Sequence, residues 1–282
     1  MPFAVVTDST AYLPEGFADR HAVRIVPLFV HIDDREGRDG IDIGPAELAV
    51  ALKERRTVTT SRPSPAEFAA IYRELLAEGA SGVLSVHLSS ELSGTWESAR
   101  LAAEEVGPDR VRVVDSRTTA MGLGFAALRA AAVAAEGGDG AQVEAAAVEA
   151  AGATKSFLIV ETLEYLRRGG RIGAAAALLG TALAVKPILH VVDGQIVPLE
   201  KVRTTSRALS RLVDLAVEAA GDQPVELAVH HLAAPDRAAE LANRLDERIP
   251  RSSGCVVSEL GAVIGAHTGP GVLSVVVCPG KL

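Results

Sequence analysis

Short apolar runs alternate with helical segments through the first half of the chain, and few folds are compatible with this order. The apolar runs cover residues 3–9, 23–32, 82–88 and 110–116. Between them the apolar residues take helical spacing, and the segment that begins at Ser64 carries Pro65 and Glu67 as a capping box with proline in the first turn. The alternation predicts an N-terminal α/β domain built on an open parallel sheet with helices on both faces.

The second half of the chain has a different pattern. Between about residues 137 and 155 the sequence is almost entirely Ala, Gly, Glu and Val, and a new apolar strand follows, so we expect a domain boundary close to residue 152. Segment 186–202 predicts a β-hairpin with Asp193 and Gly194 in its two-residue turn. Further strands are predicted at 225–232, 255–260 and 272–277, with a helix at 236–249. These elements predict domains 1–152 and 153–282, the second of mixed α+β class.

Composition excludes several classes of function. The net charge is −8 with no basic block, which argues against nucleic acid as a partner. No secretory signal is recognisable, and the Ala-rich stretch 125–152 is broken by charges and glycines, so it predicts two helices rather than a transmembrane segment. Cys255 and Cys278 lie in apolar runs and are expected to be buried thiols. The expected location is the cytoplasm.

Common catalytic and cofactor motifs are absent. Neither the G-x-S-x-G elbow of α/β-hydrolases nor the P-loop pattern occurs, and the seven His residues have no metal-ligand spacing. Segment 122–127 matches G-x-G-x-x-A, but a polar loop separates it from the preceding strand, so its glycines are interpreted as relieving crowding at a helix start. No cofactor and no metal are expected.

Four junctions rich in hydroxyl groups and glycine remain as candidate sites, at residues 7–10, 59–65, 89–95 and 265–271. The first and third follow strands of the predicted parallel sheet, at the edge where ligands of open α/β folds bind. Ser93, Gly94 and Thr95 also precede a helix, whose N-terminal N–H groups favour an anion. The alternative is that Ser93 simply caps the helix and that Thr60 and Ser61 cap loops.

Seven segments together resemble the DegV family. They are "VTDST", "TTSRPSP", "SSELSGTWESA", "VVDS", "LEYLRRGGRIG", "KPIL" and "GAHTGPG", and they occur in the family's order over nearly the whole chain. The resemblance implies two domains that enclose one long-chain fatty acid of C14–C18, with its carboxylate in a polar niche and its acyl chain in a tunnel between the domains. It also implies that some members, called FakB, present the bound acid to a fatty acid kinase, which phosphorylates the carboxylate, and are not themselves enzymes.

The resemblance also implies the residues of the site. Thr60, Ser61, Ser93, Gly94 and His267 would hold the carboxylate. Hydroxyl and backbone donors at a helix N-terminus can satisfy a carboxylate without a full counter-charge and leave its oxygen open to an incoming phosphoryl group.

Basic residues in two segments, 163–173 and 199–209, allow two interpretations. Lys201 and Arg203 lie in the segment where the resemblance implies that the kinase docks, and charge would steer that contact. Arg167, Arg168 and Arg171 are equally compatible with an ordinary solvated helix end with glycine caps.

A second class of function stays open. Ser93 as nucleophile and His267 as base would make an enzyme that acts on a small carboxylate or phosphate, although the sequence offers no third residue to orient the base.

Overall fold

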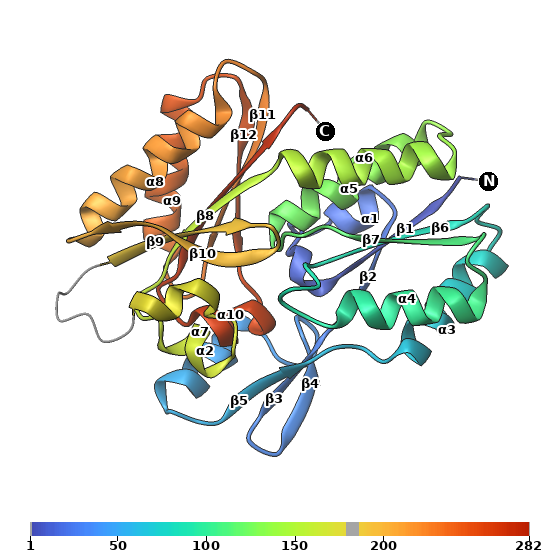
Figure 1. Cartoon of the computed structure of the whole chain (residues 1–282), viewed down its shortest axis with the longest axis horizontal. Coiled ribbons are helices and arrows are strands. Elements are labelled where there is room, and N and C mark those ends of the chain that lie inside the picture. Colours follow the sequence, from blue (N-terminus) through green and yellow to red (C-terminus); the bar gives the residue numbers. More distant parts are fainter. Residues whose placement is uncertain (1, 179–185, 282) are drawn as a thin grey trace.

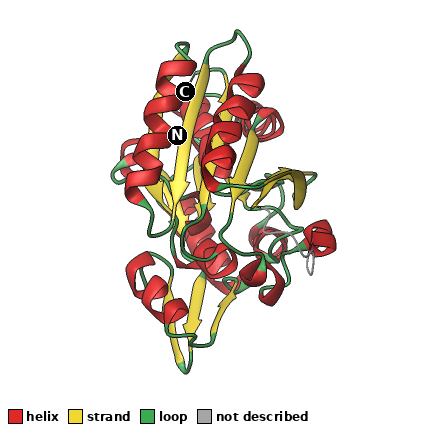
Figure 2. Cartoon of the chain, turned by 90° about the vertical axis from the view of Figure 1, so that its left-hand side faces the viewer, coloured by secondary structure: helices red, strands yellow, loops and turns green. Residues whose placement is uncertain are grey.

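The computed structural model describes residues 2–178 and 186–281, and three β-sheets organise this part of the chain (Figure 1). A four-stranded sheet and a six-stranded sheet lie on either side of a helical layer. A small three-stranded sheet forms a separate lobe at one end of the molecule (Figure 2). The predicted parallel α/β half and mixed half are both present.

The first sheet is entirely parallel, in the order β2-β1-β6-β7. Its strands are β1 (Ala4–Asp8), β2 (Val23–Val26), β6 (Val83–His87) and β7 (Val111–Asp115). Helices α3 (Pro65–Ala77) and α4 (Thr95–Val106) pack on one face, and α5 (Met121–Ala135) and α6 (Gly140–Ala153) on the other. Successive side chains of a strand point to opposite faces, so Val5 joins the core around α5 and Val6 joins the core around α3. Short helices η1 (Ser9–Ala11) and α1 (Phe17–Arg20) connect β1 to β2.

The predicted apolar run 23–32 is two strands in different sheets rather than one. Pro27 separates β2, which ends at Val26, from β3 (Phe29–Ile32), because proline has no N–H for the ladder and its ring restricts the preceding residue. Strand β3 pairs antiparallel with β4 (Arg35–Arg38) and β5 (Val58–Ser61) to form the small lobe. Helix α2 (Pro45–Lys53) lies between β4 and β5 in the chain. Segment 59–61 is therefore a strand rather than a loop.

The second half forms a mixed sheet in the order β10-β9-β8-β13-β11-β12. Its strands are β8 (Lys155–Ile159), β9 (Lys186–Val192), β10 (Gln195–Val202), β11 (Val225–His231), β12 (Ser252–Glu259) and β13 (Leu273–Pro279). Helices α8 (Thr205–Ala220) and α9 (Pro235–Arg248) cover its outer face. Helix α7 (Glu164–Arg168), the 3-10 helix η2 (Gly173–Leu178) and helix α10 (Ala262–Thr268) lie at the end nearest the small lobe (Figure 1).

Helices α5 and α6 form a layer that both large sheets share. One continuous core contains Leu84 of the first sheet, Leu128 of α5, and Leu158 and Val276 of the second sheet. The glycines of segment 122–127 lie inside α5, where a Cβ on Gly122 would overlap the Thr118 side chain, so they allow close packing. Helix α6 ends at Ala153 and β8 begins at Lys155, so the predicted boundary falls where the chain leaves this layer. No described helix is long and apolar enough to cross a membrane.

The tip of the β9–β10 hairpin is bonded to the first half of the chain. Asp193 and Gly194 have positive φ angles of 50° and 83°, as a tight two-residue turn requires, which confirms the predicted hairpin. Ser89 Oγ donates a hydrogen bond to the Gly194 carbonyl at 2.8 Å, and Arg117 Nη2 donates one to the Asp193 carbonyl at 2.8 Å. We call this set of contacts the hairpin clasp.

Candidate ligand cavity

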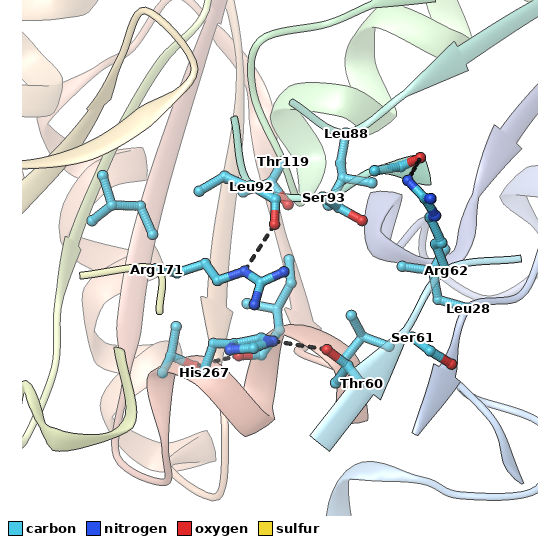
Figure 3. A pocket seen from close by; sticks show the side chains of 15 residues that line it. Leu28, Thr60, Ser61, Arg62, Leu88, Leu92, Ser93, Thr119, Arg171 and His267 are labelled. Carbon is cyan, nitrogen blue, oxygen red and sulfur yellow. Dashed lines mark hydrogen bonds between the residues drawn. The ribbon is translucent and has the colours of Figure 1, made fainter. Parts of the chain in front are cut away.

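A cavity of about 270 Å³ lies where the small lobe, the α4 N-terminus, the β9–β10 hairpin and α10 meet (Figure 3). All five residues predicted to hold a carboxylate line it: Thr60, Ser61, Ser93, Gly94 and His267. Its apolar lining comes from both halves of the chain: Leu28, Leu88, Leu92, Ile196, Val263 and Ile264. The fold therefore brings residues 60–61, 93–94 and 267, which are far apart in the chain, to one cavity.

Thr60 and His267 are directly hydrogen-bonded across the cavity wall. Thr60 Oγ1 and His267 Nε2 are 2.9 Å apart, although the residues are 207 positions apart in the chain (Figure 3). Ser61, the next residue of β5, points to the opposite face of the strand, and its hydroxyl bonds His31 Nε2 at 2.9 Å. The Ser61 hydroxyl is therefore engaged outside the Thr60–His267 pair.

Burial keeps His267 neutral. Desolvation lowers its pKa to about 4, and the nearby charge of Arg171 adds to this effect. The other ring nitrogen, Nδ1, is buried with no hydrogen-bond partner. An unpaired acceptor is more readily tolerated in the interior than an unpaired N–H, which favours the tautomer that carries its proton on Nε2. In that tautomer His267 donates to the Thr60 oxygen, so the Thr60 hydroxyl proton remains available to an acceptor other than His267.

Ser93 and Gly94 form the start of α4 in a different way from simple capping. Gly94, not Ser93, is the N-cap, and the Ser93 hydroxyl accepts from the Thr95 N–H at 3.3 Å and bonds Thr95 Oγ1 at 2.9 Å. A Cβ on Gly94 would overlap the guanidinium of Arg62, which donates to the Gly94 carbonyl at 3.0 Å. Glycine at this position therefore lets Arg62 cross the helix start.

Two arginines stand beside the cavity, contrary to the expectation of a niche without counter-charge. Arg62 and Arg171 both line it, and the Arg171 Nε donates to the Leu92 carbonyl at 2.9 Å (Figure 3). The Arg171 Nη1 also donates to the Gly169 carbonyl, so both bonds hold the guanidinium in place. From the sequence alone, Arg171 was equally compatible with being one of several arginines at a solvated helix end. Arg62 and Arg171 both lie inside segments that resemble the DegV family, and this position in the sequence could have identified them.

Thr119 is a further polar lining residue that the sequence interpretation missed. Its Oγ1 is buried without a hydrogen-bond partner, and it lines the cavity between Arg117 and Ala120, which have left-handed φ angles of 53° and 54°. Non-glycine residues in such conformations are uncommon and cluster at functional sites. Only the string "SRTTA" after β7 hints at this position.

Helix α10 is fixed by a buried carboxylate from the first half of the chain. Asp39 Oδ1 accepts from the Ala262 N–H at 2.7 Å, and Asp39 Oδ2 accepts from Ser9 Oγ at 2.9 Å and from Tyr12 OH at 3.2 Å. Tyr12 OH in turn accepts from the Ile264 N–H at 3.1 Å. Burial raises the pKa of Asp39 to about 6. This network, which we call the Asp39 cap, sets the position of the helix that carries His267.

The geometry gives no support to Ser93 and His267 as a nucleophile and its base. His267 bonds Thr60 and Ser93 bonds Thr95, with no hydrogen bond between the two residues themselves. A histidine whose pKa is lowered to about 4 is also a weak base at neutral pH. Within the described residues no cluster of His, Cys, Asp and Glu could hold a metal ion, and both cysteines are free thiols.

Lys201 and Arg203 lie away from the cavity. Both are exposed, near the end of β10, where they line a separate surface groove together with Arg207. Ile196, which lines the cavity, is five residues earlier on β10, so Lys201 lies roughly 17 Å farther along the strand. Neither residue lines the cavity.

Comparisons with known proteins agree with this architecture. The family model DegV, described as "Uncharacterised protein, DegV family", matches residues 2–280. A DegV domain-containing protein of Streptomyces coelicolor is 56% identical over 274 residues, which cover 97% of each chain.

Two solved structures are also similar. A DegV family protein from Thermus thermophilus, whose description reads "Fatty Acid Binding", has a TM-score of 0.94 and 37% identity, covering 99% of this chain and 100% of that chain. DegV of Bacillus subtilis, described as a fatty acid binding protein, has a TM-score of 0.90 and 35% identity over the same shares. The chain belongs to the DegV family.

Proposed function

We propose that this protein binds one long-chain fatty acid and presents its carboxylate to a fatty acid kinase. The proposal that the protein binds a fatty acid rests on the residues that line the cavity. The Thr60–His267 pair and the α4 N-terminus meet there with six aliphatic side chains from both halves of the chain. The fatty-acid-binding descriptions of the similar structures support the same ligand.

The carboxylate would bind at the polar side of the cavity. The Thr60 hydroxyl, oriented by His267, supplies one donor, and the start of α4 supplies a positive partial charge. Arg171 adds a full positive charge, while its bonds to two carbonyls keep the guanidinium in place. The acid would therefore be bound as its anion.

The acyl chain would supply most of the affinity. Burial of about 14 methylenes of a C16 acid at ~0.8 kcal/mol each gives on the order of 11 kcal/mol before ordering costs, against about 1 kcal/mol for each hydrogen bond. The cavity volume lies just below the usual range of roughly 300–1,000 Å³ for small-molecule pockets. A slender flexible ligand suits it better than a rigid bulky one.

Native mass spectrometry of the protein purified without detergent, followed by lipid extraction, tests the binding function. We expect one fatty acid of C14–C18 per chain. A protein that carries no fatty acid and does not take up added C14–C18 acids would refute the proposal. The matched variant pair Thr60→Val and Thr59→Val separates cavity binding from general effects, because Thr59 lies on the other face of β5.

The kinase role rests on the family resemblance and on the exposed basic residues near the end of β10. In the transfer step, an oxygen of the carboxylate attacks the terminal phosphorus of a nucleoside triphosphate held by the kinase. The bond to the nucleoside diphosphate breaks, and an acyl phosphate forms. Lys201 and Arg203 have no ion-pair partner among the described residues, so both charges are available to an acidic surface of the kinase.

Reversal of these two charges tests the docking site. In Lys201→Glu/Arg203→Glu we expect kinase-dependent acyl phosphate formation at limiting protein to fall on the order of tenfold, with fatty acid content unchanged. The control is Arg110→Glu, which makes an equal change per residue on an exposed position before β7. Full turnover by the double variant would exclude this surface as the docking site.

A further inference from the structure

A second groove, of about 410 Å³, shares a wall with the ligand cavity. Thr60, Arg171 and His267 line both spaces. The second groove also contains Arg55, Arg56 and Arg168, so four arginines line it, and its lining includes no Asp or Glu. We call it the arginine groove.

The positive charge of this groove is only partly neutralised by nearby carboxylates. Arg56 pairs with Asp33 at 2.7 Å and Arg168 with Glu164 at 2.7 Å. Arg171 donates only to carbonyls, and the Arg55 side chain makes no hydrogen bond or ion pair with the described residues. Two of the four guanidinium groups thus lack a counter-charge, in a protein whose net charge is −8. A concentration of unpaired guanidinium groups against the sign of the whole chain favours a polyanionic ligand.

Arg55 stands at a backbone position that normally takes glycine. The Arg55 N–H bonds the Leu52 carbonyl and the Arg56 N–H bonds the Ala51 carbonyl, which is the Schellman arrangement at the end of α2. Arg55 is its left-handed residue, with φ at 61°. Any residue with a Cβ, such as Arg55, is disfavoured in this conformation relative to glycine. The Arg55 guanidinium lines the groove and has no partner among the described residues.

Free donors of other kinds complete the lining. The hydroxyls of Thr57, Thr59 and Tyr165 line the groove, and none of the three makes a side-chain hydrogen bond to another described residue. The Thr60 hydroxyl, which we assign to the carboxylate, forms part of the shared wall. A group attached to that carboxylate would therefore be next to the arginine groove.

We propose that the arginine groove binds a phosphate group beside the carboxylate, with Arg55 as its principal unshared contact. This inference rests on the proposed function for the placement of the carboxylate. The phosphate group is either that of the acyl phosphate itself or the terminal phosphate of a nucleotide. Both sources present the same dianionic oxygens to the arginines.

Dissociation constants of two ligands for the full chain test the proposal. One is palmitate, and the other is 2-oxoheptadecylphosphonate, a stable analogue of palmitoyl phosphate with CH₂ in place of the bridging oxygen. Arg55→Gln should weaken binding of the phosphonate on the order of tenfold and change binding of palmitate less than twofold. The control is Lys53→Gln, an exposed cation two residues earlier that lies outside the groove, and it should affect neither ligand.

A second titration identifies the source of the phosphate. ATP is titrated into palmitate-loaded protein and into palmitate-loaded Arg55→Gln. Binding that Arg55→Gln weakens assigns the groove to a nucleotide, whereas an effect confined to the phosphonate assigns it to the acyl phosphate. The proposal is overturned if Arg55→Gln changes the binding of neither the phosphonate nor ATP. It is also overturned if Arg55→Gln weakens the binding of palmitate and of the phosphonate by the same factor. If palmitate does not bind the wild type at all, the proposed function fails. ATP binding to the wild type and to Arg55→Gln then still tests whether the groove binds a phosphate group.

Discussion

At the scale of single residues, the key feature of the cavity is the orientation of one hydroxyl. Thr60 is aligned by a neutral, buried His267, whereas the adjacent Ser61 faces the other side of β5. A threonine held in this way needs no rotameric search to meet a carboxylate, so its contribution to binding is larger than that of a free surface hydroxyl.

Replacement of Thr60 by valine keeps the shape of the side chain and removes the donor. We expect the affinity for palmitate to fall roughly fivefold, corresponding to about 1 kcal/mol for one hydrogen bond, measured by titration. Thr59→Val should leave the affinity unchanged. Equal affinities of wild type and Thr60→Val would mean that the carboxylate is held elsewhere.

Asp39 gives the protein a distinctive dependence of stability on pH. Its pKa is about 6 in the folded protein and about 4 in an unfolded chain. The folded state therefore binds more protons between these pH values, and this residue lowers the free energy of unfolding as pH rises through that window, by about 3 kcal/mol. His267 has the opposite sign, because its folded pKa of about 4 is below the ordinary value.

Denaturant unfolding at pH 4 and pH 6.5 isolates the Asp39 contribution. The stability of wild type relative to Asp39→Asn should decline between these pH values, since asparagine does not titrate. The control Asp33→Asn should show almost no change over the same range, because Arg56 holds the pKa of the exposed Asp33 below its usual value and its contribution is lost only at lower pH. A difference between wild type and Asp39→Asn that is independent of pH would contradict the assignment.

At the scale of elements, α10 and β5 decide where the site residues stand. Helix α10 has only seven residues and cannot hold itself in place, so the Asp39 cap and close packing against α2 define its position. Gly265 allows that packing, because a Cβ there would lie 2.5 Å from Leu48 Cδ2 and 3.0 Å from Leu232 Cδ2. Displacement of α10 would move His267 directly.

Gly265→Ala should therefore both destabilise the protein and weaken ligand binding. Overpacking costs roughly 1–3 kcal/mol, partly offset by up to ~1 kcal/mol of helix propensity. Gly152→Ala is the matched control, since it also lies in a helix but has open space around its Cβ position, and it should stabilise the fold slightly. Thermal unfolding and palmitate titration of both variants provide the measurements. Unaltered palmitate binding by Gly265→Ala would separate α10 packing from the site.

The elements differ in how far the sequence could predict them. The capped helix at Ser64, the hairpin at Asp193 and the parallel strands were predictable, because local spacing and turn chemistry specify them. The small lobe was not, because the sequence pattern does not tell which strands pair across 30 residues of chain. Thr60 was identified by family resemblance, while its partnership with His267 depends on a contact between distant segments.

At the scale of the whole molecule, the two halves share one core through α5 and α6. The six-stranded sheet covers one side of this layer and the parallel sheet the other, so neither half buries its apolar face alone. The sequence predicted two domains from a change of pattern near residue 152, but no local pattern reports that Leu158 and Val276 pack on the helices of the first half.

Unfolding should accordingly be a single cooperative transition. The fluorescence of Trp96, the one tryptophan, reports on α4 in the first half, and the reactivity of Cys278, buried in β13, reports on the second half. In a Cys255→Ser background we expect both probes to give the same urea midpoint. Midpoints that differ clearly would show that the halves unfold independently.

The hairpin clasp has a consequence for time rather than for affinity. Ile196 stands just past the hairpin turn, and the Ser89 that holds the turn begins the loop that leads to Ser93. A ligand that leaves between these residues must wait until the clasp opens, and local openings of this kind take microseconds to seconds. We therefore expect release of the bound acid to be limited by the protein's own motion, at a rate that the opening of the hairpin sets.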